Sequence, residues 1–310
     1  MPAKATREVF GETLAALGEK HPEIVVLDAD LSKSTKSDLF AKKFPARFFE
    51  MGIQEANMIG VAAGMALCGK VPFCCSFACF VTGRYDQIRI SVAYSQANVR
   101  IVGSHAGIGI GEDGMSQQGL EDIGLMRALP NMAVIQPGDD LECAQAVEFL
   151  VGHQGPAFLR TTRQKLDRVH QDDYRFVLGK ADLLREGKDV AIFASGGTVQ
   201  GAVKAADALK AAGIAARVVN VASLAPFDAE AAVKAGRECK GGIVAVEDHR
   251  TTGGLGSCVA EALAEGGVGA RLHRVGVAGF GESGTPEALY QKYDLDAAGI
   301  ERRVRRFLGR

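Results

Sequence analysis

The sequence predicts an α/β fold made of two parallel-sheet domains, and three observations support this. Short runs of β-branched and other apolar residues alternate with helical stretches along the chain, which is typical of parallel sheets covered by helices. Several of these runs are apolar throughout, as expected of strands that are buried on both faces. The chain has 310 residues, and at roughly 150 residues per domain this length indicates two domains.

The expected elements follow from this alternation. We expect strands at residues 24–29, 71–76, 99–103, 133–136, 157–160, 190–194, 216–219, 242–246 and 271–275. We expect helices at residues 6–21, 54–68, 85–97, 140–152, 198–212, 229–239, 256–265 and 286–292.

A polar and charged stretch near the middle of the chain marks the domain boundary. Residues 167–175 contain few apolar side chains, and a new apolar run opens after Asp189. We therefore place the first domain at residues 1–170, a linker at 171–188 and the second domain at 189–310, each domain being long enough for its own core.

Charge and cysteine content exclude several classes of function. Thirty-six Lys and Arg nearly balance 37 Asp and Glu, so nothing indicates nucleic acid or an anionic membrane as a partner. The uncharged stretches at 56–69 and 71–83 fall short of the roughly 20 residues that span a bilayer. The first ten residues lack the apolar region of a signal peptide. Seven cysteines without a Cys-x-x-Cys pair fit reduced thiols, so we expect a cytoplasmic protein.

Polar and aromatic residues follow the predicted strands of the first domain. In open parallel sheets, ligands bind beyond the carboxyl ends of the strands. Asp30, His105 and Arg163 each follow such a strand, and Phe77 and Phe80 follow another. The second domain offers mainly residues 195–198 and 247–249 at its strand ends. We therefore expect the functional site in the first domain.

Glu55 stands at the start of a predicted helix that is otherwise apolar and rich in Ala and Gly. A carboxylate at a helix N-terminus is also favoured by the helix dipole alone. Burial in so apolar a helix would disfavour the charged form, and a carboxyl that is readily protonated is useful in catalysis. The glycine-rich run at 107–114 does not indicate a nucleotide, because Glu112 and Asp113 would repel a pyrophosphate.

Two motifs carry a resemblance to a known family. The first reads Gly-Ile-Gln-Glu-Ala-Asn-Met at residues 52–58, and the second reads His-Ala-Gly-Ile-Gly-Ile-Gly-Glu-Asp-Gly at 105–114. With these motifs the sequence resembles the transketolase family, over essentially the whole chain. The resemblance implies that the first domain is a pyrimidine-binding domain and that the second is the transketolase C-terminal domain.

The resemblance also implies thiamine diphosphate as the cofactor. Glu55 would bind N1′ of its aminopyrimidine and so take part in catalysis. Phe80 would stack on the pyrimidine ring with Phe77 beside it. Asp30 is similar to the acid that the family carries near the cofactor.

The resemblance further implies a transferase that moves a two-carbon ketol unit from a ketose phosphate to an aldose. His105 resembles the catalytic histidine near the carbonyl and hydroxyl groups of the donor, and Asp113 the acid that binds a sugar hydroxyl. Arg7, Ser34 and Arg163 resemble the group that binds the sugar phosphate, which suits a phosphate dianion.

Three features depart from the family pattern. Gln117 stands where transketolases usually carry a histidine, and Gly83 where many carry a third aromatic residue. Residues 84–87 instead resemble the 1-deoxyxylulose-5-phosphate synthases. The Gly-Asp-Gly…Asn motif that holds Mg²⁺ and the diphosphate has no counterpart here.

The missing motif implies that the Mg²⁺ ligands lie on another chain and that this chain supplies none. We therefore expect the C-terminal subunit of a two-chain transketolase, active only with an N-terminal subunit and assembled as α₂β₂. Three alternatives stay open: the β subunit of a 2-oxo acid dehydrogenase component, a 1-deoxyxylulose-5-phosphate synthase-like enzyme, and a non-catalytic regulatory paralogue.

Overall fold

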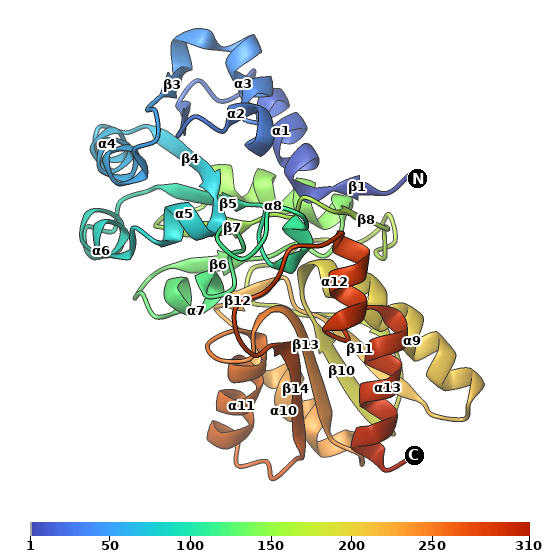
Figure 1. Cartoon of the computed structure of the whole chain (residues 1–310). Helices are drawn as coiled ribbons and strands as arrows, with labels where there is room; N and C mark the ends of the chain where they lie inside the picture. The colour runs from blue at the N-terminus through green and yellow to red at the C-terminus, as the bar shows by residue number, and fades with distance from the viewer. Residues whose placement is uncertain (1) are drawn as a thin grey trace.

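The computed structural model describes residues 2–310 and contains two large sheets covered by helices (Figure 1). The first sheet has seven strands in the order β12-β6-β7-β5-β4-β2-β3, and the second has five in the order β14-β13-β10-β11-β9. Strands β1 (Lys4–Ala5) and β8 (Lys165–Leu166) form a separate antiparallel pair. The predicted α/β class with two sheets is confirmed.

The first sheet is parallel except at one edge. Its parallel strands are β2 (Ile24–Asp28), β3 (Phe48–Glu50), β4 (Val71–Phe77), β5 (Arg100–Ser104), β6 (Ala133–Ile135) and β7 (Ala157–Arg160). The edge strand β12 (Ser223–Ala225) pairs antiparallel with β6. Because β12 follows all the other strands of this sheet in the chain, the second half of the sequence completes the sheet of the first half.

Helices cover both faces of the first sheet. The helices are α1 (Thr6–Leu17), α2 (Ser32–Thr35), α3 (Asp38–Lys43), α4 (Glu55–Leu67), α5 (Ala78–Thr82), α6 (Tyr85–Gln87), α7 (Asp122–Arg127) and α8 (Asp140–Gly152), with short 3₁₀ turns η1 (Pro45–Arg47) and η3 (Ile108–Ile110). Alternate residues of a strand point to opposite faces. Val25 and Leu27 accordingly pack in the cluster that includes α4, whereas Ile24 and Val26 pack in the cluster that includes α1 and α8.

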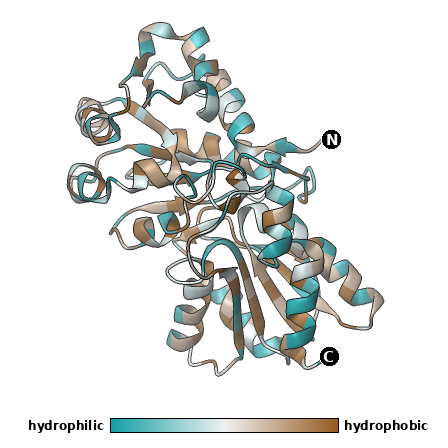
Figure 2. Ribbon diagram, in the orientation of Figure 1, coloured by the Kyte–Doolittle hydropathy of each residue, from teal (hydrophilic) through white to brown (hydrophobic). Residues whose placement is uncertain are grey.

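The second sheet has the same layered plan. Its strands are β9 (Asp182–Arg185), β10 (Val190–Ala194), β11 (Ala216–Asn220), β13 (Ile243–Arg250) and β14 (Leu272–Val277), with β9 antiparallel to its neighbour. Its helices are α9 (Val199–Ala211), preceded by the turn η4 (Gly196–Thr198), α10 (Ala229–Glu238), α11 (Leu255–Glu265), α12 (Pro286–Lys292) and α13 (Ala297–Leu308). Figure 2 shows hydrophobic residues concentrated along the strands and hydrophilic residues on the outer side of helices such as α13.

Several expected elements differ in detail. The helix expected at 85–97 is the short α6 followed by the π-helix η2 (Ile88–Tyr94). Strands β3, β9 and β12 were not expected; each has three or four residues, so the apolar pattern in the sequence is too short to reveal it. Strand β9 lies within the stretch 171–188 that we propose as a linker.

Buried polar side chains join the two halves of the chain. His170 Nδ1 lies 2.8 Å from Asp139 Oδ2, and Asn220 Nδ2 donates to Glu142 Oε1 at 2.8 Å. Asn220 Nδ2 also lies 3.1 Å from His170 Nε2. Since all four side chains are buried, these bonds fix the end of β11 against the start of α8. Within residues 2–310, no helix has both the length and the apolar character that crossing a membrane requires.

Candidate active site

Glu55 is the first residue of α4 and is 4% exposed. The chain turns sharply just before it, where Gly52 has φ +67°, a conformation that glycine adopts without strain. The carboxylate accepts a hydrogen bond of 3.0 Å from Ser76 Oγ at the end of β4. Among the described residues this is its one hydrogen-bond partner, so the buried carboxyl retains capacity for a further polar partner.

A chain of hydrogen bonds runs from Ser76 to a histidine. Ser104 Oγ donates to the carbonyl oxygen of Ser76 at 3.4 Å and lies 2.9 Å from His105 Nδ1. Arg7 Nη1 lies 2.9 Å from His105 Nε2. Because a guanidinium can only donate, Nε2 is the acceptor and the imidazole proton lies on Nδ1.

The environment of His105 keeps its imidazole neutral. The side chain is 3% exposed. Burial first, and then the positive charges of Arg7, Arg163 and Lys36, lower the pKa of His105 to about 3. Its backbone has φ +56°, a left-handed conformation that is uncommon outside glycine.

Two phenylalanines form a stack with the histidine. The rings of Phe77 and His105 have centroids 3.9 Å apart and planes 25° apart. The rings of Phe77 and Phe80 are also stacked, with centroids 5.6 Å apart and planes 13° apart. Phe77 is buried and Phe80 is half-buried, and Phe77 directly follows Ser76, the hydrogen-bond partner of Glu55, in the chain.

Two arginines provide positive charge at the other side of His105. Arg7 Nη1 also donates to the carbonyl oxygen of Ser34 at 2.8 Å. Arg163 donates to the carbonyl oxygen of Ile110 and to Glu112 Oε2, the latter at 3.1 Å. Burial first, and then the charge of Arg163, lower the pKa of Arg7. Such a cluster of guanidinium groups suits an anionic ligand.

The structure brings most, but not all, of the expected site residues together. Glu55, Phe77, Phe80, His105, Arg7 and Ser34 are linked by the contacts given above. Arg163 contacts Ile110 and Glu112 instead, and acts on His105 and Arg7 through its charge. Asp30 and Asp113 are exposed, and within residues 2–310 neither side chain makes a hydrogen bond to the cluster. Asp30 ends the turn after β2, where its amide donates to Glu50 Oε1 at 2.7 Å.

The sequence analysis did not single out Asp28, a buried acid that lies two positions before Asp30. Asp28 accepts hydrogen bonds from Leu31 N, Thr35 Oγ1 and Ser37 Oγ at 2.7–2.8 Å. Burial raises its pKa to about 6. Asp28 thus shapes the turn that presents the Ser34 carbonyl to Arg7. Its place at the end of an apolar strand, before the four hydroxyl residues Ser32, Ser34, Thr35 and Ser37, was the available signal.

Ser76 and Ser104 were also missed, although each lies at the end of a strand. Within residues 2–310, no group of three or more His, Cys, Asp and Glu side chains could hold a metal ion. All seven cysteines are free thiols.

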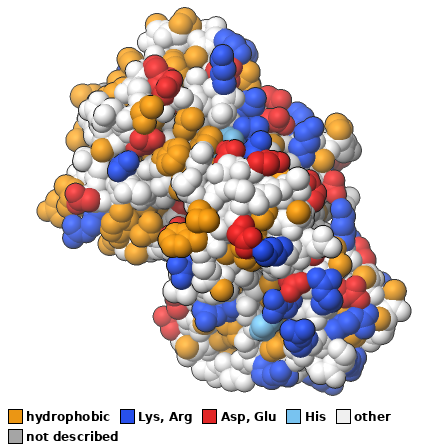
Figure 3. Space-filling view, in the orientation of Figure 1, with side chains coloured by type: hydrophobic (Ala, Val, Ile, Leu, Met, Phe, Trp, Pro, Cys, Tyr) orange, Lys and Arg blue, Asp and Glu red, His pale blue; other side chains and the backbone are white. Residues whose placement is uncertain are grey.

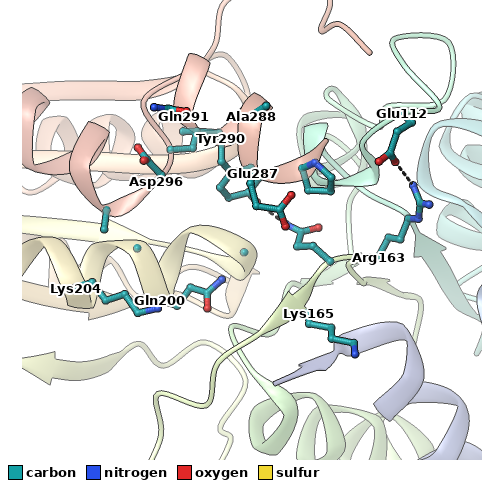
Figure 4. A pocket seen from close by; sticks show the side chains of 16 residues that line it. Glu112, Arg163, Lys165, Gln200, Lys204, Glu287, Ala288, Tyr290, Gln291 and Asp296 are labelled. Atoms are coloured by element: carbon teal, nitrogen blue, oxygen red, sulfur yellow. Dashed lines mark hydrogen bonds and ion pairs between the residues drawn. The ribbon is translucent and has the colours of Figure 1, made fainter. Parts of the chain in front are cut away.

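A groove of about 930 Å³ adjoins the cationic end of the site (Figure 4). Glu112 and Arg163 line it from the segment before residue 170, and Gln200, Glu287 and Tyr290 line it from the segment after that residue. The groove therefore lies between the two sheets, and its residues come from both halves of the sequence.

Known proteins resemble this chain over nearly its whole length. The family model "Transketolase, pyrimidine binding domain" matches residues 3–169, and "Transketolase, C-terminal domain" matches residues 179–300. A protein of Methanocaldococcus jannaschii, provisionally named a transketolase C-terminal section, is 43% identical over 97% of this chain and 95% of its own length.

Two further proteins define how the chain relates to whole transketolases. Transketolase of Mus musculus is 37% identical over 97% of this chain but only 48% of its own length. A solved structure described as a split-gene transketolase in an inactive β4 tetramer has 45% identity and a TM-score of 0.89, covering 99% of both chains.

Proposed function

Because the chain belongs to the transketolase family, we propose that it is the C-terminal subunit of a thiamine diphosphate-dependent transketolase. It would transfer a two-carbon ketol unit from a ketose phosphate to an aldose. The observation that carries the proposal is the network from Glu55 through Ser76 and Ser104 to His105 and Arg7, which places a buried acid, a neutral imidazole and a cation in one site.

The residues present fit the pyrimidine end of the cofactor. Glu55 is buried with a single hydrogen-bond partner among the described residues, so its free capacity suits N1′ of the aminopyrimidine. Phe80, with Phe77 packed behind it, would hold the pyrimidine ring by stacking. When bound, thiamine diphosphate supplies the nucleophilic carbon that takes up the ketol unit. Asp30, at the end of β2, is proposed as a further residue on the cofactor side.

His105 and Arg7 would bind the donor sugar. His105 is neutral and carries its proton on Nδ1, so Nε2 can accept a hydrogen bond from a donor hydroxyl. An anionic group that draws the Arg7 guanidinium toward itself would release Nε2 for that role. Arg163 and Ser34 complete the proposed phosphate site, and Asp113 is proposed to bind a hydroxyl from its exposed loop.

Mg²⁺ and the diphosphate would be held by an N-terminal subunit. The chain spans about half of mouse transketolase, and its sequence lacks the Gly-Asp-Gly…Asn motif that holds Mg²⁺ and the diphosphate in the family. The relative described as an inactive β4 tetramer suggests by analogy that such a chain is inactive alone. We therefore propose an α₂β₂ assembly.

An exposed apolar surface supports this association. Ile53 and Tyr94 are 76% and 82% exposed, and Leu67 and Ile90 lie on the same pair of packed elements, α4 and η2. Figure 3 shows hydrophobic side chains gathered over the edge of the molecule that carries α4 and α6. Large apolar side chains that are this exposed and gather on one edge are typical of a protein–protein interface.

The proposal is tested by reconstitution. The chain is mixed with an N-terminal transketolase subunit, thiamine diphosphate and Mg²⁺, and ketol transfer between sugar phosphates is measured. Activity in the mixture, with none from either chain alone, is the expected result. Full activity of this chain alone would refute the two-chain assignment. Release of CO₂ from a 2-oxo acid would instead identify a dehydrogenase component, and calorimetry without cofactor binding would indicate a non-catalytic paralogue.

A further inference from the structure

We propose that Asp248, Tyr290 and Gln164 act as positioning residues for the substrate loop at 107–112, so that the second domain sets the affinity for the anionic end of the sugar. This inference rests on the proposed function and extends it to residues outside the pyrimidine-binding domain. The sequence predicts only that Asp248 follows a strand of the second domain, whereas in the structure it lies within β13.

Asp248 reaches from β13 into the loop that follows His105. Its Oδ1 accepts a hydrogen bond from Ile108 N at 2.7 Å, and its Oδ2 accepts one from Gly109 N at 3.1 Å. The carboxylate is 2% exposed. Hydrogen bonds to a charged acceptor in a buried site are stronger than neutral ones, so this one carboxylate fixes two successive amides of the loop.

The loop is shaped to receive this carboxylate. Gly107 has φ +75°, and a Cβ at this position would lie 2.2 Å from Asp248 Oδ2. Any residue other than glycine would therefore be strained and would also displace the acid. On the other side, Arg160 Nη2 donates to the carbonyl oxygen of Asp248 at 2.9 Å, so the backbone of Asp248 is itself held by the first domain.

Tyr290 and Gln164 connect Asp248 to the arginine side of the site. Tyr290 OH donates to Asp248 Oδ2 at 2.8 Å and accepts from Gln164 Nε2 at 2.7 Å. A Cβ on Gly197 would lie 2.4 Å from the Tyr290 hydroxyl, so the phenol has little freedom to move. Figure 4 shows Tyr290, from α12, in the groove beside which Arg163 lies.

The same loop holds Arg163. The carbonyl oxygen of Ile110 and the carboxylate of Glu112 both accept hydrogen bonds from its guanidinium. Gln164 follows Arg163 in the chain, and a Cβ on Gly109 would lie 2.0 Å from Gln164 Oε1. The loop at 107–112 and residues 163–164 are thus closely packed against each other. Removing the Tyr290 hydroxyl would break its hydrogen bonds to Asp248 and Gln164 and let the loop and Arg163 move. This would weaken binding of the anionic group and leave Glu55 in place.

The test compares Tyr290→Phe with Tyr293→Phe in the reconstituted enzyme. Tyr293 lies one residue beyond the same helix, and its hydroxyl donates to Glu282 at 3.4 Å, outside the loop. For Tyr290→Phe we expect KM for a ketose phosphate to rise about tenfold, as for loss of a hydrogen bond to a charged group, with kcat within about twofold of wild type. KM for the same ketose without its phosphate should stay unchanged, and Tyr293→Phe should match wild type throughout.

A second measurement separates this inference from the proposed function. Hydrogen exchange of the Ile108 and Gly109 amides, in the chain without substrate, should quicken in Tyr290→Phe and in Asp248→Asn but not in Tyr293→Phe. Unchanged exchange in both variants would contradict the claim that Asp248 and Tyr290 hold the loop. Faster exchange together with equal changes in KM for both ketoses would contradict the claim that the loop sets the affinity for the phosphate. Absence of ketol transfer by the wild-type complex would contradict the proposed function. The exchange rates would still decide whether Asp248 and Tyr290 hold the loop.

Discussion

The guanidinium of Arg7 donates a hydrogen bond to Nε2 of His105 across 2.9 Å. This contact joins the first turn of α1 to the end of β5, two elements that are 98 residues apart in the sequence. It fixes the tautomer of the imidazole, and it places a positive charge beside a histidine that is already buried.

Replacing Arg7 should weaken binding of the anionic substrate. In Arg7→Gln we expect KM for a ketose phosphate to rise about tenfold or more, since a charge-assisted contact to phosphate is lost. The steady-state kinetics of the reconstituted enzyme measure this. Arg306→Gln, an exposed change on α13, is the matched control. An equal KM in the two variants would exclude Arg7 from the phosphate site.

The buried neutral state of His105 should appear in the pH dependence of stability. The folded state has a His105 pKa of about 3, whereas an unfolded histidine titrates near 6.5. The unfolded state therefore binds the proton first, and His105 reduces stability as the pH falls from 6.5 toward 3. At pH 5 the loss amounts to roughly 2 kcal/mol.

Urea unfolding at pH 7 and pH 5 tests this expectation. The free energy of unfolding of His105→Gln should fall less between the two pH values than that of wild type. The difference between the proteins isolates His105 from other buried groups, such as Asp28, whose raised pKa of about 6 acts in the opposite direction. Equal losses in the two proteins would contradict a neutral His105.

The buried polar cluster between the sheets should contribute to stability. Asn220→Ala leaves Glu142 and His170 without hydrogen bonds that both receive from this amide. We expect the free energy of unfolding to fall by about 1–3 kcal/mol, the cost of unsatisfied buried polar groups. Asn57→Ala, on the exposed side of α4, controls for the substitution itself. A loss no larger than that of the control would show that the cluster is energetically neutral.

The sequence was sufficient to predict the fold class and most of the long buried elements, although helix α13 was not expected. Strand β7 and helix α8 have the predicted bounds, because their apolar patterns are long and bounded by polar turns. The short edge strands could not be predicted. In β9 the residues alternate between half-buried and exposed, and its place is set by pairing with β11 rather than by its own pattern.

The family was predicted from two motifs, and the family matches confirm that resemblance. The candidate site was only partly predictable. Strand ends pointed to His105 and Arg163, because position relative to a sheet can be read from one segment. The role of Asp248 could not be read in this way, since Ile108 lies 140 residues away in the sequence. Contacts of that range depend on how two separate sheets pack against each other.

The most direct test of the central claim is the turnover of Glu55→Gln in the reconstituted two-chain enzyme. Glutamine keeps the size of the side chain and can still accept from Ser76, but it cannot exchange a proton with the cofactor's pyrimidine. We expect kcat to fall by about 100-fold or more, the scale of a lost acid–base group, while the melting temperature and assembly match those of the exposed control Glu148→Gln. Turnover within twofold of wild type would contradict the assignment of Glu55, and with it the proposed site.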